Sequence, residues 1–86
     1  MTDTLLQFPC DFPLKIMGRD TPEFRQAVGE IVQRHMGEID EAKVEERKSR
    51  DGTYLGITYT VHATSKEQLD DLYRELSGNP LALMVL

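Results

Sequence analysis

The chain has 86 residues, of which 40% are hydrophobic and 29% are charged, and its net charge is −5. This length suits a single domain over 1–86, because chains divide into separate cores only beyond about 250 residues. The acidic balance works against binding to a phosphate backbone, so we expect no nucleic-acid partner. The single cysteine, Cys10, excludes an internal disulfide and is typical of a reducing compartment.

Nothing in the sequence predicts export or membrane insertion. The start of the chain lacks the charged and apolar parts of a secretory leader. The longest apolar run, 81–86, has six residues, whereas a membrane-spanning helix needs about 20. We therefore expect a cytoplasmic protein with no membrane contact.

The first predicted strand follows a loosely ordered lead-in over residues 1–9. Two prolines hold the approach extended, because proline fixes φ and biases the preceding residue away from helix. Leu14 and Ile16 then alternate with Lys15 and Met17. This alternation predicts a central strand with one face toward the core.

A helix is predicted to follow, from Pro22 to about Met36. Thr21 can cap its first turn, and proline is favoured at the first helical position. Gly37 is the expected left-handed terminator. The apolar stripe of this helix consists of Phe24, Ala27, Val28, Ile31, Val32 and His35.

A hairpin is predicted at Asp51-Gly52, which separates two extended runs. This pair favours a two-residue turn, in which both residues have positive φ. The register then places Val44 opposite Tyr59. The window 38–51 has ten charged residues among fourteen, so its strand should be an edge, where charges deter further pairing. The second strand of the hairpin alternates apolar and polar residues and should be central.

A second helix and a last strand complete the pattern. Thr64 and Ser65 both have capping-box spacing, so either can begin the helix. Gly78 is expected to end the helix, and 81–86 forms a strand that is apolar on both faces. The apolar stripe of this helix consists of Leu69, Leu72, Tyr73 and Leu76.

The order strand, helix, strand, strand, helix, strand predicts an α+β fold. Right-handed crossovers that each skip one strand give the ferredoxin-like arrangement. Its four-stranded antiparallel sheet has the order 4-1-3-2, with both helices on one face. The expected core consists of Phe12, Leu14, Ile16, Phe24, Val28, Ile31, Leu55, Ile57, Tyr59, Val61, Leu69, Leu72 and Leu76.

No group of residues predicts catalysis or cofactor binding. Cys10 has an acidic neighbour, Asp11, rather than the basic neighbour that activates a nucleophilic cysteine. His35 ends a helical stripe and His62 lies on the outer side of the sheet. Neither has a partner at ligand spacing, so we expect no metal site. We therefore expect no catalytic residues, no cofactor and no enzyme.

Two candidate binding surfaces remain. The first is the turn that enters the first helix, where free N–H groups can meet an anion, formed by Gly18, Arg19, Asp20 and Thr21. The second is the sheet face that the helices leave bare, here called the outer face. Its predicted members are Lys15, Met17, Tyr54, Thr58, Thr60 and His62, together with either Ala82, Met84 and Leu86 or Leu81, Leu83 and Val85.

The outer face has two interpretations once RNA binding is set aside. RNA-recognition motifs share this element order, but they carry several aromatic residues on their central strands, and Tyr54 stands alone here. The face is less polar than a solvated sheet normally is, and the last strand is an uncharged edge. We therefore expect an unknown protein partner, or self-association, at this face or at the last strand. The alternative is a half-polar solvated face, with the C-terminal carboxylate protecting a short strand.

The order of elements resembles the ACT domains, small regulatory modules that bind amino acids between paired copies. Those domains carry Asp-x-Pro-Gly where their first helix begins. The corresponding residues here are Asp20-Thr21-Pro22-Glu23, so Glu23 replaces their glycine. The resemblance implies an ACT-like fold and, as an alternative function, a small-molecule sensor at the strand–helix turn of a dimer.

A resemblance over nearly the whole chain is to the YbeD-like family of small bacterial proteins with ACT-like fold. It rests on Phe8-Pro9-Cys10-Asp11-Phe12-Pro13-Leu14-Lys15-Ile16-Met17-Gly18, on Gly52-Thr53-Tyr54-Leu55 and on Met84-Val85-Leu86. The resemblance implies a loose link to lipoate metabolism, because the family's genes often neighbour lipoate-attachment genes. We expect a non-enzymatic binding or regulatory module that acts through protein contacts.

Overall fold

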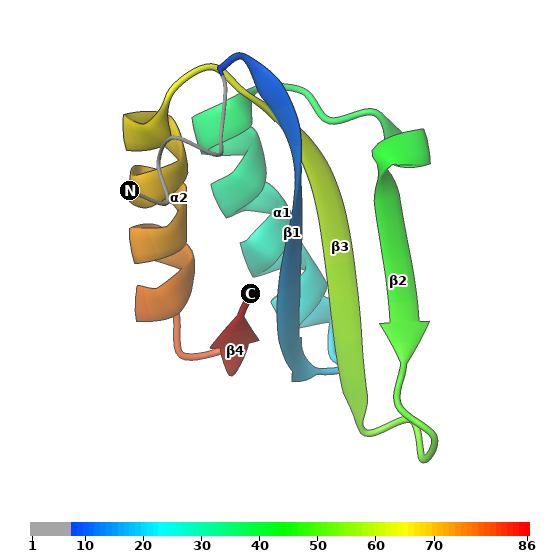
Figure 1. Cartoon of the computed structure of the whole chain (residues 1–86). Coiled ribbons are helices and arrows are strands. Elements are labelled where there is room, and N and C mark those ends of the chain that lie inside the picture. Colours follow the sequence, from blue (N-terminus) through cyan, green and yellow to red (C-terminus); the bar gives the residue numbers. More distant parts are fainter. Residues whose placement is uncertain (1–7) are drawn as a thin grey trace.

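The computed structural model describes residues 8–86 and confirms the predicted element order (Figure 1). The predicted lead-in lies mostly outside the described residues. Phe8, which it included, is half-buried and packs against the core. The elements are β1 (Cys10–Arg19), α1 (Pro22–Met36), a short 3-10 helix η2 (Glu41–Lys43), β2 (Val44–Lys48), β3 (Tyr54–Ala63), α2 (Lys66–Gly78) and β4 (Met84–Val85).

The four strands form one antiparallel sheet in the order β2-β3-β1-β4. This is the predicted order. Both helices pack against one side of the sheet and against each other (Figure 1). The α+β ferredoxin-like fold is therefore confirmed, and within residues 8–86 no helix lies over the opposite side of the sheet.

The first strand begins at Cys10 and includes Pro13. Lys15 exchanges backbone hydrogen bonds with Leu86, at 3.2 and 2.8 Å. Odd-numbered residues of β1 therefore direct their backbone groups toward β4. The missing N–H of Pro13 lies on this same side, beyond the last paired residue of β4. The proline thus removes no ladder hydrogen bond.

The register of the hairpin is as predicted. Val44 lies opposite Tyr59, and Lys48 lies opposite Leu55. The register depends only on where the centre of the turn falls, and Asp51-Gly52 marks that centre. The predicted pairing of β2 with β3 is therefore confirmed.

The predicted two-residue turn is wrong. The last backbone pair joins Ser49 N–H to the Tyr54 carbonyl, which leaves a four-residue loop between them. Gly52 has φ +78, but Asp51 does not have positive φ. The Asp51 carboxylate instead accepts from the Ser49 hydroxyl at 2.9 Å and from Thr53 N–H at 3.0 Å. These side-chain hydrogen bonds stabilise the wider loop.

The second helix begins after Ser65, which resolves the two predicted starts. The Ser65 hydroxyl accepts from Gln68 N–H at 3.1 Å. Thr64 contributes differently, because its own N–H donates to the Gln68 side chain at 2.8 Å. Gly78 is the last helical residue, and Asn79 rather than Gly78 takes the position that ends the helix.

The last strand is much shorter than the predicted 81–86. Asn79 begins a turn, in which its carbonyl accepts from Ala82 N–H at 3.1 Å. The Asn79 side chain also accepts from Leu81 N–H at 2.9 Å. Pairing with β1 therefore starts only at Leu83, whose N–H donates to the Met17 carbonyl at 2.8 Å.

The core agrees with the prediction apart from three residues. Phe12 is half-buried and meets Tyr73 edge to face, with ring centroids 6.4 Å apart. Val32 and Ala63 are buried although the prediction left them out of the core. The buried residues are Leu14, Ile16, Phe24, Val28, Ile31, Val32, Leu55, Ile57, Tyr59, Val61, Ala63, Leu69, Leu72 and Leu76.

Candidate functional site

Strand pairing places most of the predicted partner-binding residues on the outer face. Residues that lie opposite each other on neighbouring strands share one side of the sheet. Met17 lies opposite both Gly56 and Met84. Of the two sets left open for the last strand, the one with Met84 therefore faces outward. Val85 lies opposite the buried Ile16 and packs against the core instead.

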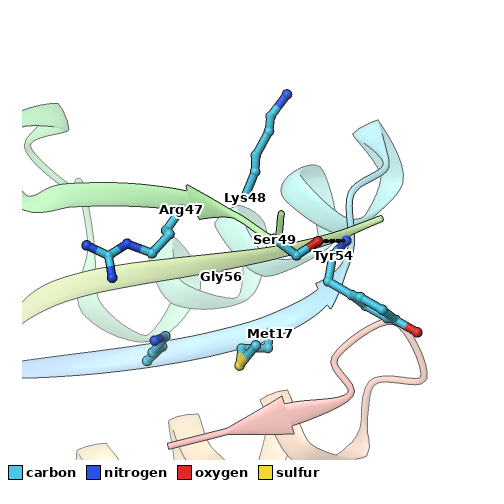
Figure 2. A pocket seen from close by; sticks show the side chains of 7 residues that line it. Met17, Arg47, Lys48, Ser49, Tyr54 and Gly56 are labelled. Atoms are coloured by element: carbon cyan, nitrogen blue, oxygen red, sulfur yellow. Dashed lines mark hydrogen bonds between the residues drawn. The ribbon is translucent and has the colours of Figure 1, made fainter. Parts of the chain in front are cut away.

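A hollow of about 130 Å³ lies on the outer face, toward the end of the sheet that carries the hairpin loop (Figure 2). It is open because position 56 carries no side chain. A Cβ added to Gly56 would stand 3.3 Å from Lys15 Cε and 3.7 Å from Met17 Cγ. The residues that line the hollow are Lys15, Met17, Arg47, Lys48, Ser49, Tyr54 and Gly56.

The lining combines apolar surface with positive charge. Met17 and Tyr54 supply apolar surface beside Gly56, and Arg47 reaches the hollow from the edge strand (Figure 2). Lys48 extends in another direction and pairs with Asp20 at 3.5 Å. Such a surface suits a ligand that carries an apolar group next to an anion.

The remaining predicted residues of this face lie farther along the sheet. Thr58 lines a neighbouring part of the face with Lys15 and Arg47. Thr60 and His62 line a separate hollow of about 160 Å³ together with Asp11. The predicted set is therefore divided into two groups by the structure.

In the second group, His62 Nδ1 lies 3.1 Å from Asp11 Oδ1. This hydrogen bond, followed by the charge of Lys43, holds the pKa of Asp11 below its usual value. Both side chains are more than half exposed. The arrangement is a hydrogen-bonded pair at the surface rather than an enclosed acid–base site.

Four lining residues were not predicted as site residues, namely Arg47, Lys48, Ser49 and Gly56. Arg47 belongs to the charged window 38–51, whose strand was predicted to be an edge. Its position opposite Gly56 follows from the predicted register. The signal for the hollow was therefore present, as a long cationic side chain facing a glycine in the middle of a strand.

Two polar side chains of the predicted ligand turn have partners within the protein. Thr21 Oγ1 accepts from Phe24 N–H at 3.1 Å, which caps α1 as expected. The Asp20 carboxylate is only 11% exposed and pairs with Arg25 at 2.8 Å. A Cβ on Gly18 would clash with the Leu81 carbonyl and stand 2.6 Å from the Phe24 ring. Gly18 therefore serves close packing.

A further hollow lies beside this turn. Its volume is about 200 Å³. Arg19 and Thr21 belong both to its lining and to the predicted ligand turn, whereas Gly18 and Asp20 are not among its lining residues. The lining consists of Arg19, Thr21, Phe24, Pro80, Leu81 and Leu83.

The other reactive side chains make structural contacts. His35 Nε2 lies 2.6 Å from Glu75 Oε1, and Arg34 contacts the same carboxylate. Their hydrogen bonds, that of His35 first, lower the pKa of Glu75. Cys10 is half-buried at the start of β1. Within residues 8–86, no group of three histidine, cysteine or acidic residues is placed to hold a metal ion.

The match to a known family covers residues 3–86, and the family is described as "Protein of unknown function (DUF493)". The chain belongs to this family. The UPF0250 protein of Paraburkholderia phytofirmans is 49% identical over 86 residues, which cover 100% of this chain and 97% of the relative. The UPF0250 protein of Bordetella pertussis is 50% identical over 84 residues, covering 98% of this chain and 92% of the relative.

A third relative, the UPF0250 protein of Nitrosomonas europaea, is 44% identical over 84 residues, covering 98% of this chain and 97% of the relative. These relatives are bacterial and small, and the resemblance to the YbeD-like family is confirmed. In the part of the chain that the structure describes, no helix has the length and apolar character to cross a membrane.

Proposed function

We propose that the domain is a non-enzymatic binding or regulatory module that acts through protein–protein contacts. Its contact surface is the outer face together with the β4 edge. The observation that carries the proposal is the collection of exposed apolar side chains there. Tyr54 is 40% exposed, Met84 51% and Leu86 58%. Contiguous apolar surface of this kind marks interaction sites in small proteins.

The strand edge supports the same proposal. The segment 81–86 contains no charged side chain, and β4 is the outermost strand beside β1. Natural edge strands normally carry charges or bulges that block further pairing. An unprotected edge beside an uncovered face is the surface on which a partner adds a strand. A loose link to lipoate metabolism belongs to this proposal and makes lipoate-attachment enzymes the first proteins to seek among the partners.

Quantitative pull-down from lysate of a native host tests the proposal. The variant Tyr54→Asp with Met84→Asp adds two negative charges to the outer face. The variant Gln33→Asp with Ser77→Asp adds two charges at exposed positions on the helices. Circular dichroism must first show that both variants fold.

We expect specific partners to be recovered with the wild type and the helix variant, and to be lost with the outer-face variant. Equal recovery with all three proteins would contradict the proposal. So would a loss of partners that is confined to the helix variant, because it would place the contact surface on the other side of the sheet.

The second candidate function is an ACT-like small-molecule sensor. The hollow beside Arg19 and Thr21 favours it, because that hollow adjoins the start of α1. Its volume of about 200 Å³ is below the roughly 300–1,000 Å³ of typical ligand pockets, so a second copy would have to complete the site.

Native mass spectrometry of the purified protein tests this candidate. A dimer that carries a metabolite, lost on Arg19→Ala, would favour the sensor over the protein-contact module.

A further inference from the structure

Cations without a carboxylate partner collect on the outer face. The chain has ten lysines and arginines. Among residues 8–86, six of them pair with carboxylates, namely Arg25, Arg34, Lys43, Lys48, Lys66 and Arg74. The described carboxylates leave four cations unpaired. Lys15, Arg19 and Arg47 share the outer face, and Arg50 lies in the hairpin loop.

These three residues, Lys15, Arg19 and Arg47, are here called the basic patch. Arg19 lies over the Tyr54 ring, with its guanidinium carbon 5.9 Å from the ring centre. Glu45 is the carboxylate that lines this part of the face with Lys15 and Arg47. Three cations against one carboxylate make the face locally positive, although the whole chain has a net charge of −5.

The electrostatic attraction of a short ligand depends on the charges of the basic patch rather than on the net charge of the chain. Charges more than about 8 Å away are screened at physiological salt. Lys15 and Arg19 are four residues apart on β1, so their Cα atoms are separated by about 13 Å. Side chains on one side of an extended peptide recur about every 6.6 Å. Two acidic residues four positions apart in such a peptide therefore match Lys15 and Arg19, and the residue midway between them lies over the hollow.

We propose that the outer face binds an acidic, extended segment of a partner protein. An apolar side chain of the segment enters the hollow over Gly56, between Met17 and Tyr54. Its carboxylates contact the basic patch, where arginine can make paired hydrogen bonds to a carboxylate. This inference rests on the proposed function and adds the chemistry of the partner.

Charge complementarity favours an acidic protein segment over two other occupants, a second copy of this chain and a nucleic acid strand. Two copies joined through this face would bring six cations together without a counter-charge other than Glu45. A nucleic acid strand would extend past the patch along the outer face, where it would meet the carboxylates of Glu45 and Asp11. Tyr54 is also the only phenylalanine, tyrosine or tryptophan of the described outer face, whereas single-strand binding uses several such rings for base stacking.

Fluorescence anisotropy with a labelled synthetic peptide tests the inference. The probe is a short peptide with glutamate at positions 1 and 5, leucine at position 3 and serine at positions 2 and 4, so that the glutamates and the leucine share one side of the extended chain. The control probe has glutamine in place of glutamate. A labelled single-stranded oligonucleotide is the third probe. We expect the glutamate peptide to bind best, and its affinity to fall as salt rises.

Matched variants locate the binding site. Arg47→Gln and Arg50→Gln each remove one arginine that has no described carboxylate partner, but only Arg47 lines the hollow. We expect Arg47→Gln to weaken binding of the glutamate peptide about tenfold, as loss of one charge-assisted contact does. Arg50→Gln should stay within about twofold of the wild type. Gly56→Ala should weaken binding as well, because its methyl group enters the hollow.

Equal effects of Arg47→Gln and Arg50→Gln would overturn the inference, as would equal binding of the glutamate and glutamine peptides. Tighter binding of the oligonucleotide would show a nucleic-acid surface instead. A dimer in sedimentation that Arg47→Gln abolishes would show a second copy as the occupant. If the pull-down still loses its partners with the outer-face variant while the peptide results fail, the proposed function stands and only the acidic chemistry is wrong.

Discussion

Truncation of the Ile57 side chain tests whether β3 occupies a central position in the sheet. Ile57 is 1% exposed and lies on β3 between Ile16 of β1 and Glu46 of β2. Ile57→Ala removes three buried carbons, which at about 0.8 kcal/mol each gives a transfer loss of about 2.4 kcal/mol. The cavity left behind adds to this loss, so the free energy of unfolding should fall by about 2–5 kcal/mol.

Urea unfolding followed by circular dichroism measures this change. A chain of this size has a slope of about 1 kcal/mol per molar urea, so the midpoint should fall by about 2 M or more. Leu83→Ala is the matched control, because it also removes three carbons, from a side chain that is 61% exposed. Its midpoint should stay close to that of the wild type.

The slope must be the same for all three proteins, since a changed slope would indicate an altered unfolded state or loss of two-state behaviour. If Ile57→Ala and Leu83→Ala shifted the midpoint equally, the central position of β3 would be refuted.

Three further predictions use the same assay. Gly18→Ala should lower stability by about 1–3 kcal/mol, because its methyl group would overlap the Leu81 carbonyl; an unchanged midpoint would contradict this packing. Gly52→Val should cost about 1–2 kcal/mol, since φ is +78 there, and a stable variant would contradict the loop geometry. Hydrogen bonds from Thr53 N–H and Ser49 hold the pKa of Asp51 below its ordinary value of 3.8. Asp51 therefore stabilises the fold above pH 3.8 and loses this effect as the pH falls further, so the deficit of Asp51→Ala should shrink in acid. A deficit that grows in acid would contradict the assignment.

Most of the fold could be predicted because local signals and side-chain alternation agree. Asp51-Gly52 fixed the centre of the hairpin and with it the pairing of β2 with β3. The type of turn could not be predicted, because it depends on the Ser49 and Asp51 side chains replacing backbone hydrogen bonds. The length of β4 was also hidden, since an apolar sequence does not reveal where Asn79 holds the chain in a turn.

The candidate site was only half predictable for a related reason. Alternation assigns Lys15 and Met17 to the outer face, but it does not say which cations are neutralised. Lys48 pairs with Asp20, which lies on a distant part of the sequence, whereas its neighbour Arg47 finds no described carboxylate. Such pairings depend on tertiary contacts, so the basic patch became visible only in the structure.

Site-specific photo-crosslinking in a native bacterial host tests the central claim most directly. A benzophenone amino acid replaces Tyr54 on the outer face in one protein and Arg74 on α2 in another, and both side chains are exposed. If the outer face is the contact surface, illumination should give a covalent adduct of defined mass from position 54 and none from position 74. An adduct from position 74 alone, or from neither position, would contradict a function through protein contacts at the outer face.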